Sequence, residues 1–506
     1  MSLLQQRCLL LLQACLALLI STAASTKSTL FESGTVISFD DATKTPMVLW
    51  NTSLLVTGDR IAAIFDDTQN ITTPSGTERV SAKGKIISPG FVDTHRHGWQ
   101  TAYKTLGSNT TLAEYFERYG EFTQASTVFT ADDVYLGQLT GIYEALNSGV
   151  TSILEHAHAT FSNETSAAYL NASIESGVRM WWCYAFHTLS NGFSIEDQMA
   201  NFQELSQDER LDQSLVEMGM AYDAFASATT DEIQSIVDLA QSSNISAFTT
   251  HYLGGPWFDA NSPTRLRDLG FINTSTPIVF SHASYITPED VSLLRTYNHF
   301  VSTTPESEMH YGHDHQDAAF ALDQAALGVD THFTYSTDIV GQARMWLQST
   351  RLKFFRKTLQ GWRIPRNSPM SVNQAFLMAT RSGGLALRRP DIGVLREGAK
   401  ADIVVFDGAS PNMLGWVDPV AAVILHSHVG DVQHVMVDGN WRKRDWKLVL
   451  GQNQTEVEQR FLESAARIQR KWQETPLPQM EGMYQNGVDY GSTYTMDVVQ
   501  GNGTGY

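Results

Sequence analysis

The chain has 506 residues, of which 42% are hydrophobic and 18% are charged. This length and composition are typical of a globular protein with one large domain and a satellite, or with two to four smaller domains. With 54 acidic against 35 basic residues, the net charge is −19. A charge of that sign repels phosphate backbones, so the composition argues against nucleic acid as a partner.

Residues 1–25 have the pattern of a secretory signal peptide. Arg7 supplies a positive charge near the start, Cys8–Ile20 form an apolar run, and small residues follow at 21–25. The apolar run is shorter than the roughly 20 residues that span a bilayer. We therefore predict cleavage and no stable membrane span in the mature protein, with an uncleaved anchor as the alternative. No later stretch of the sequence is long and apolar enough for a membrane helix.

Nine Asn-x-Ser/Thr sequons follow this leader and predict a glycoprotein. They lie at Asn51, Asn70, Asn109, Asn163, Asn171, Asn244, Asn273, Asn453 and Asn502. Removal of the leader leaves Cys183 as the one remaining cysteine, so the mature chain has no partner for an internal disulfide. We expect a protein that is secreted or held in the lumen of the secretory pathway.

Strand and helix patterns divide the rest of the chain into four parts. Residues 26–90 contain short β runs separated by Gly, Asp and Asn, and residues 391–450 return to the same pattern. Between them, residues 91–390 alternate apolar strands with helical stretches, which is typical of a parallel α/β fold. Residues 451–506 contain a predicted helix, 455–474, and a polar tail. We therefore predict a TIM-like (β/α)8 barrel with a small β-sandwich built from the N- and C-terminal segments.

The segment IISPGFVDTHRHGWQ places two histidines directly after an apolar strand. His95 and His97 are two residues apart, so both imidazoles face the same side of an extended strand, with Cα atoms roughly 6.6 Å apart. This separation lets both rings bind one metal ion at about 2.0–2.1 Å. Asp93 lies just before them and could orient a ligand histidine. By itself, the spacing also fits two ordinary polar residues at a strand end.

Three further candidates follow apolar runs at the C-terminal ends of predicted strands. His251 ends ISAFTTH, His282 ends PIVFSH and Asp338 ends HFTYSTD. In a (β/α)8 barrel this end carries the active site. Histidines and a carboxylate on one rim form the ligand set that Zn²⁺ favours, with Fe²⁺, Mn²⁺ or Co²⁺ as alternatives. We therefore expect a site for one divalent metal ion.

Several segments resemble one known family. PGFVDTHRH resembles the first-strand motif of the amidohydrolase superfamily, in the branch that contains cytosine, guanine and triazine deaminases and chlorohydrolases. SGVTSILEHAH is similar to the family's early barrel strand, and TTPESEMHYGH to its seventh-strand segment. NQAFLMATRSGGLALRRPDIGVLREGAKADIVVFD is close to the segment that joins the last barrel helix to the outer sandwich. The resemblance covers nearly the whole mature chain.

The resemblance implies a role for each candidate. His95 and His97 match the first-strand metal ligands. His251 matches the fifth-strand ligand, and Asp338 the eighth-strand ligand. His282 matches the sixth-strand histidine, which binds the attacking water or the substrate. A zinc-class ion lowers the pKa of bound water to about 7, after which Asp338 would move a proton to the leaving group and His282 would stabilise the oxyanion.

One position departs from the family pattern. Many deaminases of this branch carry a glutamate three residues after the fifth-strand histidine as a proton shuttle, and this chain has Gly254 there. The sequence also has no clear fourth-strand lysine that could bridge two metals, which favours a site for one ion. The proton transfer would then fall to Asp338, or to Glu308 or Glu306. Glu308 is equally a candidate for substrate binding or for a structural hydrogen bond.

Two more residues are predicted to contact the substrate. His158 follows the strand SILEHA, and Trp99 lies two residues beyond His97. We expect His158 to line the pocket and Trp99 to form one of its walls. His156 lies on the same strand face as His158, so a second metal site at this pair is an alternative.

These observations predict a secreted metal-dependent hydrolase. We expect it to cleave a non-peptide C–N bond, or a related carbon–heteroatom bond, of a small specialised metabolite with a metal-activated water. The first alternative is a metal-assisted lyase, dehydratase or decarboxylase that uses the same site. The second is a metal-free binding protein that retains the fold.

Overall fold

The computed structural model describes residues 27–69, 71–257, 260–313 and 316–478, with short pieces at 480, 483–484 and 488–489. The predicted signal peptide lies outside the described residues. Among the residues that are described, no helix is both long and apolar enough to cross a bilayer.

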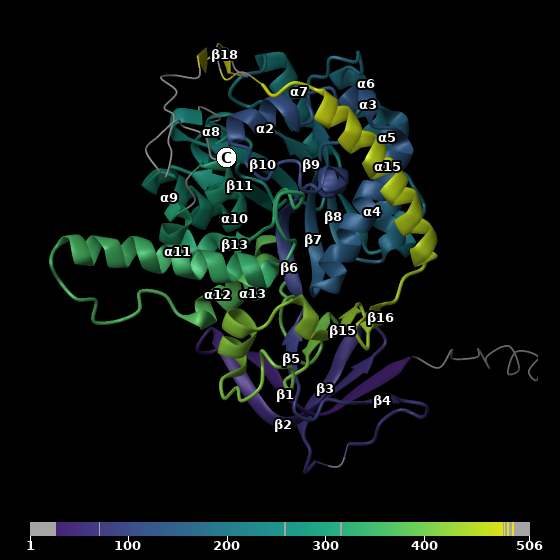
Figure 1. Ribbon diagram of the computed structural model, residues 1–506, viewed down its shortest axis with the longest axis vertical. Coiled ribbons are helices and arrows are strands. Elements are labelled where there is room, and N and C mark those ends of the chain that lie inside the picture. Colours follow the sequence, from purple (N-terminus) through teal and green to yellow (C-terminus); the bar gives the residue numbers. More distant parts are fainter. Residues whose placement is uncertain are drawn as a thin grey trace, which may run out of the picture.

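Eight parallel strands form a barrel at the centre of the molecule (Figure 1). Neighbours in sequence are neighbours in the sheet, as expected when helical crossovers connect parallel strands. The strands are β6 (Phe91–Arg96), β7 (Val150–Ala157), β8 (Arg179–Phe186), β9 (Val216–Tyr222), β10 (Phe248–Leu253), β11 (Ile278–Ser284), β12 (Phe300–Thr303) and β13 (Ala325–Leu327). The α/β barrel predicted from the sequence is confirmed.

Helices surround the barrel on the outside (Figure 1). Several begin at caps that the sequence encodes: Thr130 and Asp133 form a capping box at the start of α4, and Thr287 with Asp290 does so at α9, where Pro288 occupies the first turn. The helices are α2 (Leu112–Arg118), α3 (Ala125–Val128), α4 (Ala131–Asn147), α5 (Asn163–Ser176), α6 (Ile195–Leu205), α7 (Thr230–Ser242), α8 (Pro263–Asp268), α9 (Pro288–Tyr297), α10 (Pro305–Tyr311) and α11 (Ile339–Gln360).

The barrel closes where the first strand meets the segment after the last. The backbone NH groups of Val329 and Asp330 donate to the carbonyl of His95, at 3.0 and 2.8 Å. The NH of His97 donates to the carbonyl of Asp330, and the Asp93 carboxylate accepts from the NH of Val329. Asp93 therefore holds this seam together and does not orient a ligand imidazole.

A second sheet, of nine strands, packs below the barrel in the view of Figure 1. Its strands come from both ends of the chain, because β5 pairs with β14. They are β1 (Ser28–Asp40), β2 (Thr45–Thr57), β3 (Arg60–Asp66), β4 (Glu78–Ser81), β5 (Ile86–Pro89), β14 (Ile403–Phe406), β15 (Val432–Val437), β16 (Asn440–Arg444) and β17 (Lys447–Leu448). This confirms the predicted module of N- and C-terminal segments.

The remaining helices connect and cover these two parts. They are α12 (Val372–Ala379), α13 (Arg381–Ala386), α14 (Pro419–Ala421) and α15 (Gln454–Glu474). Helix α15 agrees with the helix predicted at 455–474, and it runs along the outside of the barrel against α4. Its Trp472 is buried, and the indole NH donates to the carbonyl of Arg118.

The predicted eighth strand is wrong. The run THFTYSTD, residues 331–338, forms a turn, a bend and irregular backbone, and the strand is instead β13. The run contains the β-branched and aromatic residues that strands favour. Its Phe333, however, is buried among the rings of Tyr103, Tyr115 and Tyr119, so packing in this aromatic cluster outweighs the local β preference.

Candidate active site

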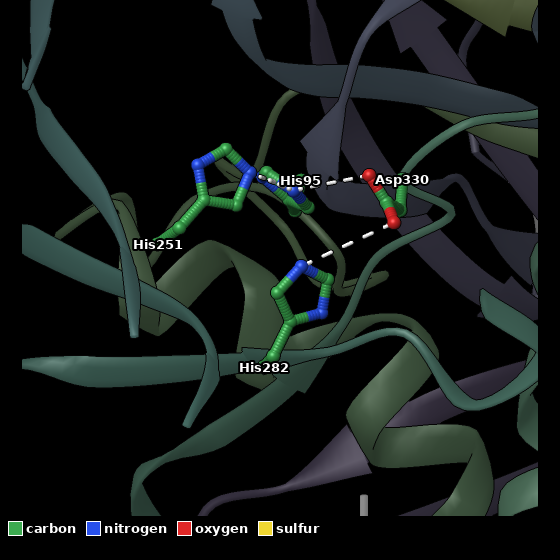
Figure 2. Close-up of side chains that lie close together, drawn as sticks. All are labelled: His95, His251, His282 and Asp330. Carbon is green, nitrogen blue, oxygen red and sulfur yellow. Dashed lines mark hydrogen bonds and ion pairs between the residues drawn. The ribbon is translucent and has the colours of Figure 1, made fainter. Parts of the chain in front are cut away.

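Four side chains converge at the C-terminal end of the barrel. His95 comes from β6, His97 directly follows β6, His251 comes from β10, and Asp330 comes from the segment after β13. His251 Nε2 lies 3.2 Å from both His95 Nε2 and His97 Nε2. Asp330 Oδ1 lies 3.4 Å from His95 Nε2 and 3.2 Å from His97 Nε2. Figure 2 shows His95, His251 and Asp330 pointing toward one another, with His282 beside them.

These four separations fit one tetrahedral metal ion, and His282 belongs to the same cluster, because ligand atoms of His95, His251, His282 and Asp330 all lie within 4.8 Å of one another. Ligand atoms at about 2.0–2.1 Å from a zinc ion lie roughly 3.3–3.4 Å from each other. The other ring nitrogens of the histidines are already paired. His97 Nδ1 donates to the carbonyl of His156, and His251 Nδ1 donates to Asp223 Oδ2 at 2.8 Å. His95 Nδ1 pairs with Ser281 Oγ. The Nε2 atoms are therefore the ones available to a metal.

The electrostatics of the cluster also favour a cation. Burial alone would raise the pKa of Asp330, but hydrogen bonds from His95 and His97 hold it well below its ordinary value. Burial lowers the pKa of His95, so this ring is neutral. For His251, burial is outweighed by the Asp223 carboxylate, which raises the pKa to about 9. The carboxylates of Asp330 and Asp223 supply the negative charge that a divalent ion requires, and the His251 ring would release its proton when it binds that ion.

His282 occupies a bulge at the end of β11. Its φ is 68° and that of Ala283 is 52°, and the pairing with β10 shifts by one residue at this point. Such bulges often re-aim a side chain next to an active site. The Nδ1 atom lies 2.9 Å from Thr304 Oγ1, which leaves Nε2 facing Asp330 Oδ2 at 4.0 Å. Burial lowers the pKa of His282 to about 3, so the ring is neutral.

Asp338 lies elsewhere, which corrects the predicted carboxylate ligand and proton carrier. Its side chain caps the N-terminus of α11 by accepting from the NH of Val340 at 3.0 Å. Asp330, eight residues earlier, takes the place beside the histidines because the last strand is β13 and not residues 332–338. Glu306 also lies outside the cluster, where it pairs with Gln342.

Glu308 and Trp99, which were predicted to contact the substrate, do not line the cavity that the described residues form. Glu308 is buried behind His282, where its carboxylate accepts from the NH of Thr304 at 2.8 Å and from Thr303 Oγ1 at 2.9 Å. Trp99 is fully buried, and its indole NH donates to His158 Nδ1 at 2.9 Å. Each residue instead holds a neighbouring histidine in position: Glu308 holds His282, and Trp99 holds His158.

His158 lines the cavity, as the sequence analysis expected. Its ring stacks on His97 with centroids 4.0 Å apart. Because Trp99 donates to Nδ1, the proton of the neutral ring resides on Nε2, which faces the cavity as a donor. The structure differs from the alternative prediction of a second metal site at His156 and His158. His156 Nε2 lies 3.2 Å from Asp223 Oδ2, in a group with His251 that does not include His158.

The cavity over this cluster has a volume of about 580 Å³, a size typical of sites for small molecules. Its floor is formed by polar groups that include His97, His251, His282 and Asp330. The apolar part of its wall includes Leu112, Phe116, Phe122, Phe186 and Leu253.

Three acidic residues of the site were missed by the sequence analysis. Asp330 was passed over in favour of Asp338. Asp223 directly follows β9, so the rule that strand ends carry the site could have found it. Glu121 lies in the loop between α2 and α3 and lines the cavity, with Oε2 3.9 Å from His158 Nε2. Burial raises the pKa of Glu121 to about 7. No sequence pattern distinguishes this glutamate from other loop residues.

The backbone around Gly254 leaves no room for a side chain. A Cβ atom there would lie 2.8 Å from the carbonyl oxygen of Ser284 and 3.2 Å from Tyr285 Cβ. The NH of Gly254 donates to that same carbonyl. A glutamate at this position would therefore require the bulge of β11 to move.

Comparison with protein families gives one match over most of the chain, since the model of the Amidohydrolase family matches residues 86–442. Curated relatives include the 5-methylthioadenosine/S-adenosylhomocysteine deaminase of Dictyoglomus thermophilum. It is 23% identical over 384 residues, 73% of this chain and 84% of the relative. The 5'-deoxyadenosine deaminase of Methanosarcina mazei is 24% identical over 407 residues, 77% of this chain and 88% of the relative.

Solved structures share the fold. An adenosine deaminase from Xanthomonas campestris with bound zinc superimposes with a TM-score of 0.74 at 18% identity, covering 88% of this chain and 99% of that one. A triazine hydrolase from Arthobacter aurescens gives a TM-score of 0.73 at 18% identity, covering 87% and 99%. At these identities the superpositions establish the fold.

Proposed function

The chain belongs to the amidohydrolase family, as its motifs predicted, and we propose that it hydrolyses a non-peptide C–N bond, or a related carbon–heteroatom bond, of a small organic molecule. It is an enzyme of the metal-dependent hydrolase type. The observation that carries the proposal is the set of donor atoms on His95, His97, His251 and Asp330, in which His251 and Asp330 each lie 3.2–3.4 Å from His95 and His97.

These four residues would hold one divalent ion, most simply zinc. When bound, a zinc-class ion lowers the pKa of water to about 7 and polarises the bond under attack. His282 lies beside this position, and its ring is fixed from behind by Thr304 and Glu308. In our proposal His282 orients the water or the substrate, because a buried neutral imidazole is a poor base and a good hydrogen-bond partner.

The proton transfer is assigned to Asp330 and Glu121. Water oxygen forms a bond to the substrate carbon, and the C–N bond breaks. Asp330 accepts a proton from the water, and Glu121 donates one to the leaving nitrogen. The proton on Asp330 then returns to Glu121 through solvent in the cavity. With a pKa of about 7, Glu121 is substantially protonated at neutral pH and can serve as this acid.

The walls of the cavity indicate the class of substrate. Aromatic and aliphatic side chains at Phe116, Phe122 and Phe186 suit a flat, weakly charged ring system. The relatives are named as deaminases of adenine nucleosides, which supports an exocyclic amine on a heteroaromatic ring as the first bond to test. Because Gly254 replaces the usual shuttle, we extend the proposal to cyclic amides and other small specialised metabolites.

We also propose that the enzyme works as a secreted or lumenal glycoprotein. The support is the leader-like pattern of residues 1–25 and the accessibility of the sequons. Of the described ones, Asn51, Asn109, Asn163, Asn244, Asn273 and Asn453 are exposed, and Asn171 is half-buried. Expression in a eukaryotic secretory host, followed by glycosidase treatment and a mass shift, tests this part of the proposal.

Two measurements test the reaction. Metal analysis of gently purified protein should find about one equivalent of a divalent ion, and His95→Ala with His97→Ala should lose it together with all turnover. Heteroaromatic amines and cyclic amides are then screened in ¹⁸O-water. Label in the product supports hydrolysis, whereas turnover without label, in a product that does not exchange oxygen, would replace the proposal with lyase chemistry.

A further inference from the structure

The second half of α11 and the loop after it form an arm, residues 351–368, that extends beyond the rest of the molecule (Figure 1, left). Large apolar side chains on this arm lie in solvent. Trp362 is 99% exposed and Ile364 is 90% exposed. Trp362 also has a φ of 52°, a left-handed conformation that glycine usually adopts at the end of a helix. Among the described residues, none covers the Trp362 side chain.

The arm is also the most basic part of an acidic protein. Residues 339–390 contain ten of the chain's 35 Lys and Arg residues and none of its 54 Asp and Glu residues. Six of the ten lie on the arm, at Arg351, Lys353, Arg356, Lys357, Arg363 and Arg366. The rest of the chain therefore carries 54 acidic against 25 basic residues. A surface that combines apolar and positive groups requires a partner that is both apolar and negative.

The apolar groups run along the side of the arm as well as at its tip. Leu352, Phe355 and Leu359 are spaced by three and four residues, so they lie on one face of α11. This stripe covers about 10 Å of the helix, and Trp362 continues it past the end. A bilayer surface would cover the tip and leave the stripe in water. A groove on a protein covers both, which favours a protein partner.

We propose that the arm docks on the acidic surface of a second copy of this chain. A second copy supplies the complementary charge, because all acidic residues of the chain lie outside 339–390. Arm-to-arm contact is excluded as the main interface, since two surfaces with six positive charges each repel one another. When each arm lies on the other body, the two contacts are equivalent, as in a two-fold dimer.

The test is the mass of the full-length protein in solution, measured by sedimentation with a variant that carries Trp362→Asp and Ile364→Asp. Both side chains are exposed, so the variant should fold, and its far-UV circular dichroism should match that of the wild type. We expect a wild-type dimer whose dissociation constant rises at least about tenfold in the variant, and which weakens at high salt. Val417→Asp, at an 85% exposed site outside the arm, is the matched control and should leave the dimer unchanged.

Three results would overturn the proposal. The first is a wild type that stays monomeric at all soluble concentrations. The second is a dimer that the double substitution leaves as tight as before, which would place the interface elsewhere. The third is a monomer that binds vesicles of phosphatidylserine through Trp362, which would make a lipid surface the partner. None of these measurements uses the catalytic reaction, so they are independent of the proposed function.

Discussion

The first and last strands of the barrel meet at one seam, but only the candidate metal ligands of the first strand could be predicted from the sequence. His95 lies in β6 and His97 directly follows it, so their two-residue spacing along an extended chain puts both rings on one face. Strand β13 has three residues, and Asp330 lies three residues beyond its end. Periodicity identifies a ligand that belongs to a strand. It fails for one that is positioned by the hydrogen bonds of a barrel seam between residues 235 positions apart.

The largest expected effect separates the two aspartates that compete for the role of eighth-strand ligand. Asp330→Asn should lower kcat by more than about 10³-fold, because the substitution removes both a metal ligand and a proton acceptor. Metal content and turnover of the purified variant measure this. The matched control is Asp338→Asn, which should retain metal and activity. If the two variants behave in the opposite way, the ligand is Asp338.

Removal of the Glu121 carboxyl should have the next largest effect. Glu121→Gln should lower kcat by about 10²-fold if Glu121 is the general acid. The sign follows from its raised pKa: the acid form predominates below pH 7 and is lost above it, so wild-type kcat should fall as pH rises through about 7. The variant should lack this fall. A pH profile that keeps the same descending limb in the variant would assign that limb to another group.

A smaller effect, on metal affinity, is expected from a change at Asp223, whose carboxylate accepts from the His251 ring. Asp223→Asn weakens the acceptor that fixes the His251 ring, which should reduce metal affinity by about 10–100-fold while one ion still binds at saturation. Competition with a chromogenic chelator measures the affinity. Unchanged affinity would show that the backbone alone orients His251.

The smallest effect concerns stability. Asp338→Ala removes the N-terminal cap of α11 and should lower the free energy of unfolding by about 1 kcal/mol. Urea denaturation followed by circular dichroism measures the difference, and kcat should not change. A large loss of kcat with little loss of stability would show that Asp338 takes part in the reaction.

The fold was predictable because its two parts have different periods in the sequence. Apolar strands alternate with helices between residues 91 and 390, and short β runs lie on both sides. His95, His97, His251 and His282 could be named because each lies within two residues of the C-terminal end of a barrel strand. The structure brings these four together.

The remaining site residues depend on packing that the sequence does not encode locally. Glu121 reaches the cavity from a loop, and its pKa is set by burial under residues distant in the chain. Glu308 and Trp99 looked like pocket residues from their positions, but each points at a histidine and away from the cavity. Whether a polar side chain faces the pocket or supports its wall is decided by the rotamers of its neighbours.

The position of the donors on the barrel seam has a consequence for how the protein matures. The four donors span residues 95 to 330, and the first and last of them are joined by the hydrogen bonds that complete the barrel. No partial chain released before residue 330 contains the full set. Contacts of such long range are slow to form, because a long loop must close first. Metal uptake therefore reports that synthesis has passed the last strand and that the two ends of the barrel have met.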